Sequence, residues 1–379
     1  MGFKKVPVNR TMVEIHRRAS DVMNNVVRSW DNVMGAVGLG GRRADYDDLH
    51  YEFVGGAKDE LRMKHYDKSL RLLWKAEQHA PWSSFRDCSK LEKNLADQAE
   101  KALNKEESLA RQRLTTQDFR ALLDREYTLR EKQAMVAILS AIGHGEAYAW
   151  LVSSDVLRHV KSSGAKASVT MQVLEEAKHF VVMRELVHAF GVPVPPFTGW
   201  EYILLEQILR ARWLEKFFGM NIVVEGIALS IFGMIADFPG MEVLRLFHLD
   251  ESRHTALPVN YFAEFPMTRW EKINPLSRFN RIRYVLPAVP LVFALEDDLA
   301  ELGIDAFAFG GSILRKILHL SERAGFLLPL PGEWYIETLN AVFNGYCYAT
   351  RPNHAWQRFQ DADTTVGADV RKVEEAIFA

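Results

Sequence analysis

Hydrophobic positions recur every three or four residues along most of the chain, whereas alternating apolar and polar runs are nearly absent. The first spacing is typical of amphipathic helices and the second of strands, so the sequence predicts an all-α fold. Residues 10–35 carry the helical pattern and run into the glycine-rich segment GAVGLGG, which predicts a break. The region 58–124 is charged and amphipathic and predicts three shorter helices.

The apolar positions become denser between residues 127 and 266. Three breakers interrupt this region, namely KSSGAK at 161–166, GVPVPPFTG at 191–199 and DFPG at 237–240. They divide it into four consecutive helices. The first and third breakers are short enough for antiparallel hairpins, and the proline-rich second one allows a longer crossover. This connectivity predicts a four-helix bundle.

The chain divides into three predicted parts. Residues 1–126 form an N-terminal helical extension, residues 127–266 form the bundle, and residues 267–379 form a C-terminal helical extension packed on it. Helical patterns in the last part cover about 275–302, 305–326 and 332–349. A polar segment, RPNHAWQRFQDADTT, then precedes a short final helix.

Composition and charge exclude several classes of protein. With 48% hydrophobic and 25% charged residues, the chain of 379 residues is expected to fold rather than remain disordered. The formal charge of −2 and the absence of a basic block give no support to nucleic-acid binding. Two cysteines, Cys88 and Cys347, supply neither a disulfide framework nor an iron–sulfur cluster within the chain. A reducing cytoplasm fits this composition best.

Targeting and membrane signals are also missing from the sequence. The segment MGFKKVPVNR has no apolar core of signal-peptide length. Glu225 interrupts the longest uncharged stretches, which stay below the ~20 residues that cross a bilayer. No membrane span is therefore expected.

Two Glu-x-x-His motifs carry the most specific chemical signal. They are LEEAKHF, with Glu176 and His179, and LDESRHT, with Glu251 and His254. Residues three apart project from one face of a helix, so each pair can present a carboxylate and an imidazole to one metal ion. A single pair arises often by chance. In the alternative without metal, each glutamate forms a solvent-exposed ion pair with a basic residue: Glu176 with Lys178 or Arg184, and Glu251 with Arg245 or Arg253.

Two further glutamates stand alone in apolar helices. Glu225 is the only charged residue from Phe217 to Ala236, and Glu146 has similarly uncharged surroundings. A buried ionised carboxylate costs several kcal/mol or more unless it is paired, protonated or bound to metal. We therefore expect a cation to face each of them.

The spacing of the breakers brings these glutamates together. Glu225 lies 11 residues before Ala236 and Glu251 lies 11 residues after Gly240, so both reach the same level, ~16 Å from the turn. The match of Glu146 with Glu176 is less even. It requires that the first helix end by about His159 or that the turn be asymmetric.

The order Glu146, Glu176-x-x-His179, Glu225, Glu251-x-x-His254 resembles the ligand set of ferritin-like di-iron carboxylate proteins. The E-E-x-x-H and D-E-x-R-H forms are similar to acyl-carrier-protein desaturases, bacterial multicomponent monooxygenases and ribonucleotide reductase small subunits, without selecting one of them. The resemblance covers residues 127–266 and implies that these six residues hold two metal ions. Carboxylate and imidazole ligands suit two irons, or manganese with iron.

The resemblance also implies supporting residues around the metal ligands. The acidic residue before each metal-binding glutamate is expected to bind the histidine of the opposite motif, which pairs Asp250 with His179 and Glu175 with His254. His144, His188 and His248 are interpreted as neighbouring histidines that do not bind metal. No catalytic residue beyond the ligands is identified, and no tyrosine stands out as a radical site.

The function implied by the resemblance is O₂ activation. The leading hypothesis is a di-iron oxygenase or oxidase that hydroxylates, N-oxygenates or desaturates a hydrophobic or aromatic organic substrate. The long extensions can enclose such a substrate. Since the chain has no dinucleotide fingerprint, an external ferredoxin or flavoprotein reductase is expected to supply electrons. A homodimer is also expected, as is common for helical bundles. Two alternatives stay open, a ferroxidase without organic substrate and a scaffold whose carboxylates are only salt-bridged.

Overall fold

The described part of the protein is built from helices. The computed structural model describes residues 3–37, 44–72, 98, 100–101, 103–110, 118–261 and 268–359. Every regular element in these ranges is helical, which confirms the all-α prediction.

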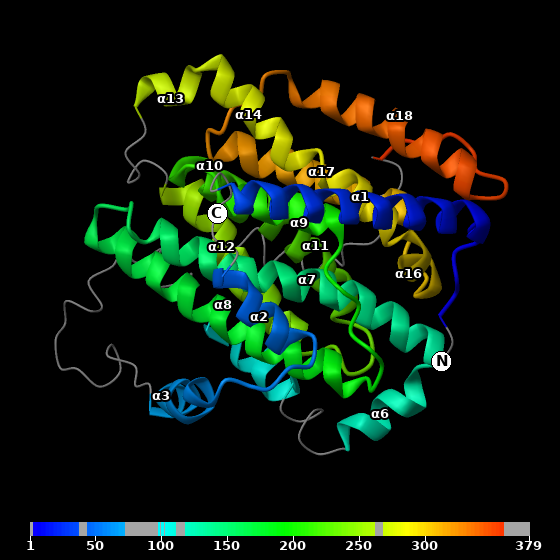
Figure 1. The fold of residues 1–379 in the computed structure, drawn as a ribbon, viewed down its shortest axis with the longest axis horizontal. Coiled ribbons are helices and arrows are strands. Elements are labelled where there is room, and N and C mark those ends of the chain that lie inside the picture. Colours follow the sequence, from blue (N-terminus) through cyan, green and yellow to red (C-terminus); the bar gives the residue numbers. More distant parts are fainter. Residues whose placement is uncertain are drawn as a thin grey trace.

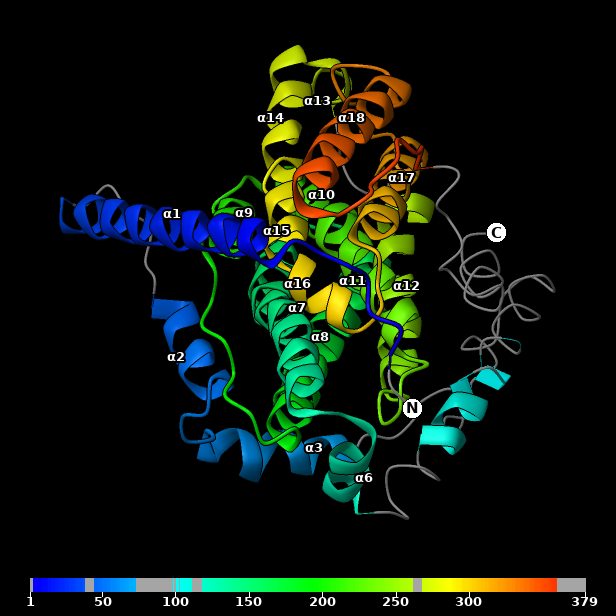
Figure 2. The same ribbon diagram turned by 90° about the vertical axis from the view of Figure 1, so that its right-hand side faces the viewer.

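Four helices form the centre of the molecule (Figures 1 and 2). They are α7 (Leu129–Val156), α8 (Ser163–Ala189), α11 (Glu225–Ile235) and α12 (Leu244–Tyr261). Helix α7 packs along α8, α11 packs along α12, and α12 also contacts α8. The short turns thus produce two helix pairs that face one another, as the breakers predict.

Local capping fixes where the first pair begins. Thr128 caps α7 in a capping box, in which its hydroxyl accepts a hydrogen bond from the Glu131 N–H at 3.3 Å and its own N–H donates to Glu131 at 2.8 Å. The Ser162 hydroxyl caps α8 by accepting from the Ala165 N–H at 3.0 Å. Because α7 ends at Val156, before His159, Glu146 and Glu176 can reach the same level of the pair.

The third predicted helix is not continuous, and this part of the prediction was wrong. Its sequence forms α9 (Gly199–Leu209), α10 (Trp213–Phe218), the π-helix η3 (Gly219–Val224) and then α11. The break at 210–212 contains neither glycine nor proline, so the helical spacing passes through it unmarked. Tertiary contacts hold α9 apart: Tyr148 on α7 donates a hydrogen bond to Glu206 at 2.8 Å.

The N-terminal extension follows the prediction in part. Helix α1 (Arg10–Ala36) matches its predicted range, whereas α2 (Ala44–Phe53) was not predicted. Of the three helices expected between 58 and 124, the described residues contain η1 (Arg62–Tyr66), which continues into α3 (Asp67–Leu72), helical residues at 103–110, and α6 (Phe119–Glu126). Much of the remaining segment lies outside the described residues.

The C-terminal extension covers the upper part of the helix pairs in Figure 2. The predicted helix 275–302 is divided into three, because Pro287 interrupts its hydrogen bonding and the chain turns again at Leu295. The short final helix expected at the C-terminus lies outside the described residues. The helices of this extension are α13 (Arg269–Ile273), α14 (Pro275–Val285), α15 (Ala288–Ala294), α16 (Glu296–Glu301), α17 (Ala306–Arg323) and α18 (Gly332–Thr350).

One hydrophobic core joins the extensions to the central helices. Phe53 and Leu123 from the first part and Phe343 and Phe359 from the last belong to the same cluster of buried side chains as α7 and α8. Leu129–Val156 and Trp213–Ile235 are long and apolar enough to span a membrane, but 78% of the most apolar window of each is buried within the protein. Core helices share this composition, so it is weak support for a membrane span.

Candidate metal centre

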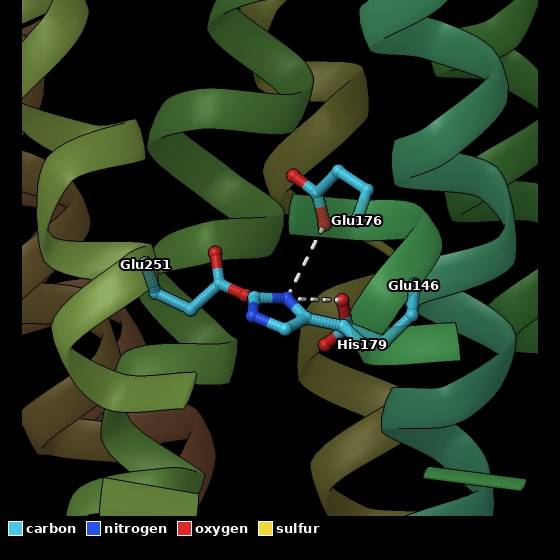
Figure 3. A group of neighbouring side chains, drawn as sticks. All are labelled: Glu146, Glu176, His179 and Glu251. Atoms are coloured by element: carbon cyan, nitrogen blue, oxygen red, sulfur yellow. Dashed lines mark hydrogen bonds and ion pairs between the residues drawn. The ribbon is translucent and has the colours of Figure 1, made fainter. Parts of the chain in front are cut away.

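The structure brings the six sequence-predicted residues together between the four central helices. Glu146 comes from α7, Glu176 and His179 from α8, Glu225 from the start of α11, and Glu251 and His254 from α12. Their possible ligand atoms form two groups, and within each group all atoms lie within 4.8 Å of one another. The first group, drawn in Figure 3, is Glu146, Glu176, His179 and Glu251, and the second is Glu176, Glu225, Glu251 and His254.

Both histidines direct the same ring nitrogen toward the carboxylates. Nδ1 of His179 lies 3.0 Å from Glu251 and 3.3 Å from Glu146. Nδ1 of His254 lies 2.8 Å from Glu251 and 3.1 Å from Glu176. In Figure 3, the three carboxylates of the first group surround the His179 ring from three different helices. The shared glutamates therefore lie between the two imidazoles.

The other ring nitrogen of each histidine is bound by an outer carboxylate. Nε2 of His179 lies 3.0 Å from Asp250, and Nε2 of His254 lies 2.9 Å from Glu175. These are the two predicted pairs, and both are confirmed as hydrogen bonds. Because the outer carboxylate accepts from Nε2–H, Nδ1 is the ring nitrogen that a metal can take in exchange for a proton.

Basic side chains neutralise the two outer carboxylates. Arg253 contacts Glu175 at 2.6 Å and Asp250 at 2.5 Å, and Lys178 contacts Asp250 at 2.6 Å. Both basic side chains are about half exposed to solvent, whereas Asp250 is buried. The outer layer thus carries two negative and two positive charges and connects the histidines to the surface.

The alternative in which the two motif glutamates form solvent-exposed ion pairs was wrong. Glu176 and Glu251 are 0% exposed. The basic residues proposed as their partners bind other groups: besides Lys178 and Arg253, Arg184 contacts Glu185 at 3.0 Å and Arg245 contacts Asp237 at 2.5 Å.

Burial and crowding of like charges set the protonation of the inner carboxyls. Burial, reinforced by repulsion from Glu251, raises the pKa of Glu146 and of Glu225 well above the ordinary value. Burial also opposes ionisation of Glu251, but the adjacent His254 and its other partners hold the pKa of Glu251 well below the ordinary value. Without metal, therefore, protons rather than cations compensate part of the charge.

The donor set fits hard metal ions. Glu176 Oε2 and Glu251 Oε1 are buried and accept no hydrogen bond within the described residues. Buried polar atoms are normally satisfied, so two such oxygens that face an imidazole nitrogen point to a missing partner. Carboxylate oxygen and imidazole nitrogen suit iron or manganese. The centre can therefore hold metal ions.

Two amides at the centre were missed by the sequence reasoning. The Gln172 side chain donates to Glu176 at 3.2 Å and to Glu225 at 3.4 Å. The Asn221 amide donates to Gln172 and to the His254 carbonyl oxygen, both at 3.0 Å. Gln172 stands one helical turn before Glu176, and this spacing places both side chains on the same helix face, which could have identified Gln172 from the sequence. Asn221 lies in the π-helix, and nothing in the sequence marks it.

The three remaining nearby histidines lie outside both groups of possible ligands. His188 contacts the Phe53 carbonyl oxygen at 2.9 Å, and His248 contacts the Leu229 carbonyl oxygen at 3.2 Å. His144 packs against Phe197.

An apolar cavity adjoins the centre on the side of Glu146 and Glu225. Helices α7, α9 and α11 supply most of its wall, and α15 and α17 of the C-terminal extension add Leu291 and Phe309. The extension therefore helps to enclose a space next to the candidate ligands.

Removing an outer carboxylate is expected to weaken metal binding without removing a ligand. In Asp250→Asn, His179 loses the charged acceptor that fixes its orientation, and we expect iron affinity to fall roughly 10- to 100-fold. Competition with a chelator measures this. Asp237→Asn, a change at an exposed carboxylate paired with Arg245, is the control and should leave the affinity unchanged. Equal affinities for Asp250→Asn and the wild type would contradict the role of this pair.

Comparisons of the chain with protein-family models, curated proteins and solved structures give no match. The interpretation of the centre therefore depends on its own geometry.

Proposed function

We propose that the protein is a ferritin-like di-iron oxidoreductase that uses O₂ to oxidise a small organic substrate. The observation that carries this proposal is the overlap of the two ligand groups, because both include Glu176 and Glu251. Two carboxylates shared by two sites a few ångströms apart are suited to bridging a pair of ions. A pair of metals between carboxylate-bearing helices is the arrangement of the ferritin-like proteins.

Charge balance supports two divalent ions. The inner layer contains four carboxylates and two imidazoles, and it is buried, so its full ionisation needs compensation. Two divalent cations supply four positive charges, and the outer layer is already balanced by Lys178 and Arg253. Iron in both positions fits the donors, and manganese in one of them fits equally.

The protein's own residues would prepare the space in which the chemistry occurs. Bound iron would supply the redox chemistry that reduces O₂. Glu146 and Glu225 are both metal-ligand candidates and lining residues of the cavity, which places a substrate in it directly beside the centre. The apolar wall from α9 and α15 excludes water and favours an apolar substrate.

Electrons would come from a separate donor, a ferredoxin or a flavoprotein reductase. Arg253 and Lys178 mark the point where the hydrogen-bonded chain from the histidines reaches solvent. We place the approach of the donor at this surface of α8 and α12.

Oxygen consumption tests the proposal. With iron, a chemical reductant and candidate substrates, we expect O₂ uptake to continue well beyond the amount of bound iron and to yield oxidised product. Glu251→Ala, measured in parallel, should show no such uptake. Uptake that ends at the amount of bound iron with every substrate would support the ferroxidase alternative. Failure to bind iron would support a salt-bridged scaffold.

A further inference from the structure

One polar side chain in the cavity has no part in the candidate metal centre. The wall contains three carboxyl side chains, Glu146, Glu201 and Glu225, and the other lining residues are apolar. None of the lining residues is basic. Because Glu146 and Glu225 belong to the groups of possible metal ligands, Glu201 of α9 is the only polar side chain among the described lining residues that is left for a substrate.

Glu201 is a buried carboxyl without a cationic partner in the described part of the chain. It is 3% exposed, and its carboxylate accepts a hydrogen bond from the Thr198 N–H at 2.5 Å in the capping box of α9. Burial raises the pKa of Glu201 to about 7, although both hydrogen bonds from Thr198 oppose the rise. Such a carboxyl is poised to ionise when a cation approaches.

The chain contains a direct comparison for this residue. Glu131 occupies the same position in the capping box of α7 and is also buried, at 2% exposed. There the hydrogen bonds from Thr128 and from the Phe3 backbone, together with the charge of Lys5, overcome the effect of burial and lower the pKa of Glu131. Glu131 does not line the cavity. Capping therefore explains a glutamate at both positions, but it does not explain why the residue that lines the cavity, Glu201, has no cationic partner among the described residues.

We propose that Glu201 binds a basic nitrogen, so that the cavity takes an amine with an apolar body. This inference rests on the proposed function, because it names the substrate class of the same site. A protonated amine supplies the positive charge that Glu201 lacks, and the rest of the molecule replaces water along the apolar wall. The apolar body then lies beside α7 and α11, which carry Glu146 and Glu225.

The same wall disfavours acidic substrates. A carboxylate in this cavity would meet Glu201 and would find no lysine, arginine or histidine among the lining residues. Desolvation and repulsion would then act together. Neutral molecules would be accepted but would leave Glu201 unpaired.

Binding of three probes of similar size tests the proposal: benzylamine, benzyl alcohol and benzoate. Calorimetric titration into the iron-loaded protein without reductant avoids turnover. We expect benzylamine to bind at least about tenfold more tightly than benzyl alcohol, and benzoate to bind most weakly. Benzylamine affinity should rise between pH 6 and pH 8 as Glu201 ionises.

Glu201→Gln tests the residue itself, because glutamine also forms a capping box and preserves the helix start. The variant should lose the preference for benzylamine and its pH dependence while binding benzyl alcohol within about twofold of the wild type. Glu131→Gln, the matched change at the α7 cap, should retain both. Tight benzoate binding, or an unchanged amine preference in Glu201→Gln, would overturn the proposal. None of these titrations depends on O₂ chemistry. The amine proposal can therefore fail while the proposed function stands, and the proposed function can fail while the amine proposal stands.

Discussion

Glu251→Ala is expected to lower bound iron from about two ions per chain to almost none, and Glu176→Ala should do the same. Each of these glutamates belongs to both ligand groups, so its loss removes a donor from both ions at once. Since a site that loses a bridging carboxylate also loses charge compensation, neither ion should remain. Elemental analysis after loading with iron and removal of excess metal measures the result.

Glu146→Ala and Glu225→Ala provide the contrast within the same centre. Each belongs to only one group, so each variant should retain about one ion per chain. Glu185→Ala, which removes a half-exposed carboxylate from the same helix as Glu176, should retain both ions. If all four inner variants lost metal equally, or if none did, the assignment of Glu176 and Glu251 as shared ligands would be wrong.

Glu225→Met is expected to stabilise the metal-free protein by about 0.5–2 kcal/mol while removing one candidate metal ligand. Glu225 is 2% exposed, and burial together with the repulsion of Glu251 opposes its ionisation. Methionine has a similar length and needs no compensating charge. A gain of this kind would show that the carboxylate is kept for binding rather than for folding.

The stability gain of Glu225→Met is expected to depend on pH, and the pKa of Glu225 decides the direction. The pKa of Glu225 is raised in the folded protein above the ordinary value of 4.5. As pH rises through 4.5 the unfolded chain loses its proton first, so this group makes the folded state progressively less stable. The advantage of Glu225→Met should thus be smaller at pH 5 than at pH 8.

Urea unfolding in the presence of a chelator at these two pH values measures the difference. Glu322→Met, at an exposed position of α17, is the control and should change the free energy of unfolding little at either pH. A loss of stability in Glu225→Met at pH 8 would mean that the carboxylate is well compensated without metal, which would contradict the pKa argument.

The inner residues of the centre were accessible from the sequence for simple physical reasons. Glu225 is conspicuous because no other charged residue surrounds it in the sequence. The Glu251-x-x-His254 motif is conspicuous because three-residue spacing places both side chains on one helix face. The outer pair of Asp250 with His179 followed from the resemblance. These inferences depend on residues that are close in sequence or joined by short turns, where helical geometry determines the relative positions of the side chains.

The cavity and its carboxyl were not accessible in the same way. Thr-x-x-Glu capping boxes occur at the starts of α7, α9 and α13, and their sequences are alike. Glu201 becomes a cavity residue only through tertiary packing, because most of the wall outside α9 comes from α7, α11, α15 and α17. The break before Trp213 was missed because its arginines fit a helical pattern equally well.

The π-helix Gly219–Val224 makes the position of Glu225 sensitive to chain length. Each of its hydrogen bonds encloses one residue more than an α-helical turn does, as if a single residue had been inserted ahead of Glu225. If the same residues wound as a regular α-helix, everything on one side of the stretch would be rotated by about 100°. The wide turn therefore adjusts the helical phase, so that α10 keeps its own packing face while α11 directs Glu225 toward the other candidate ligands.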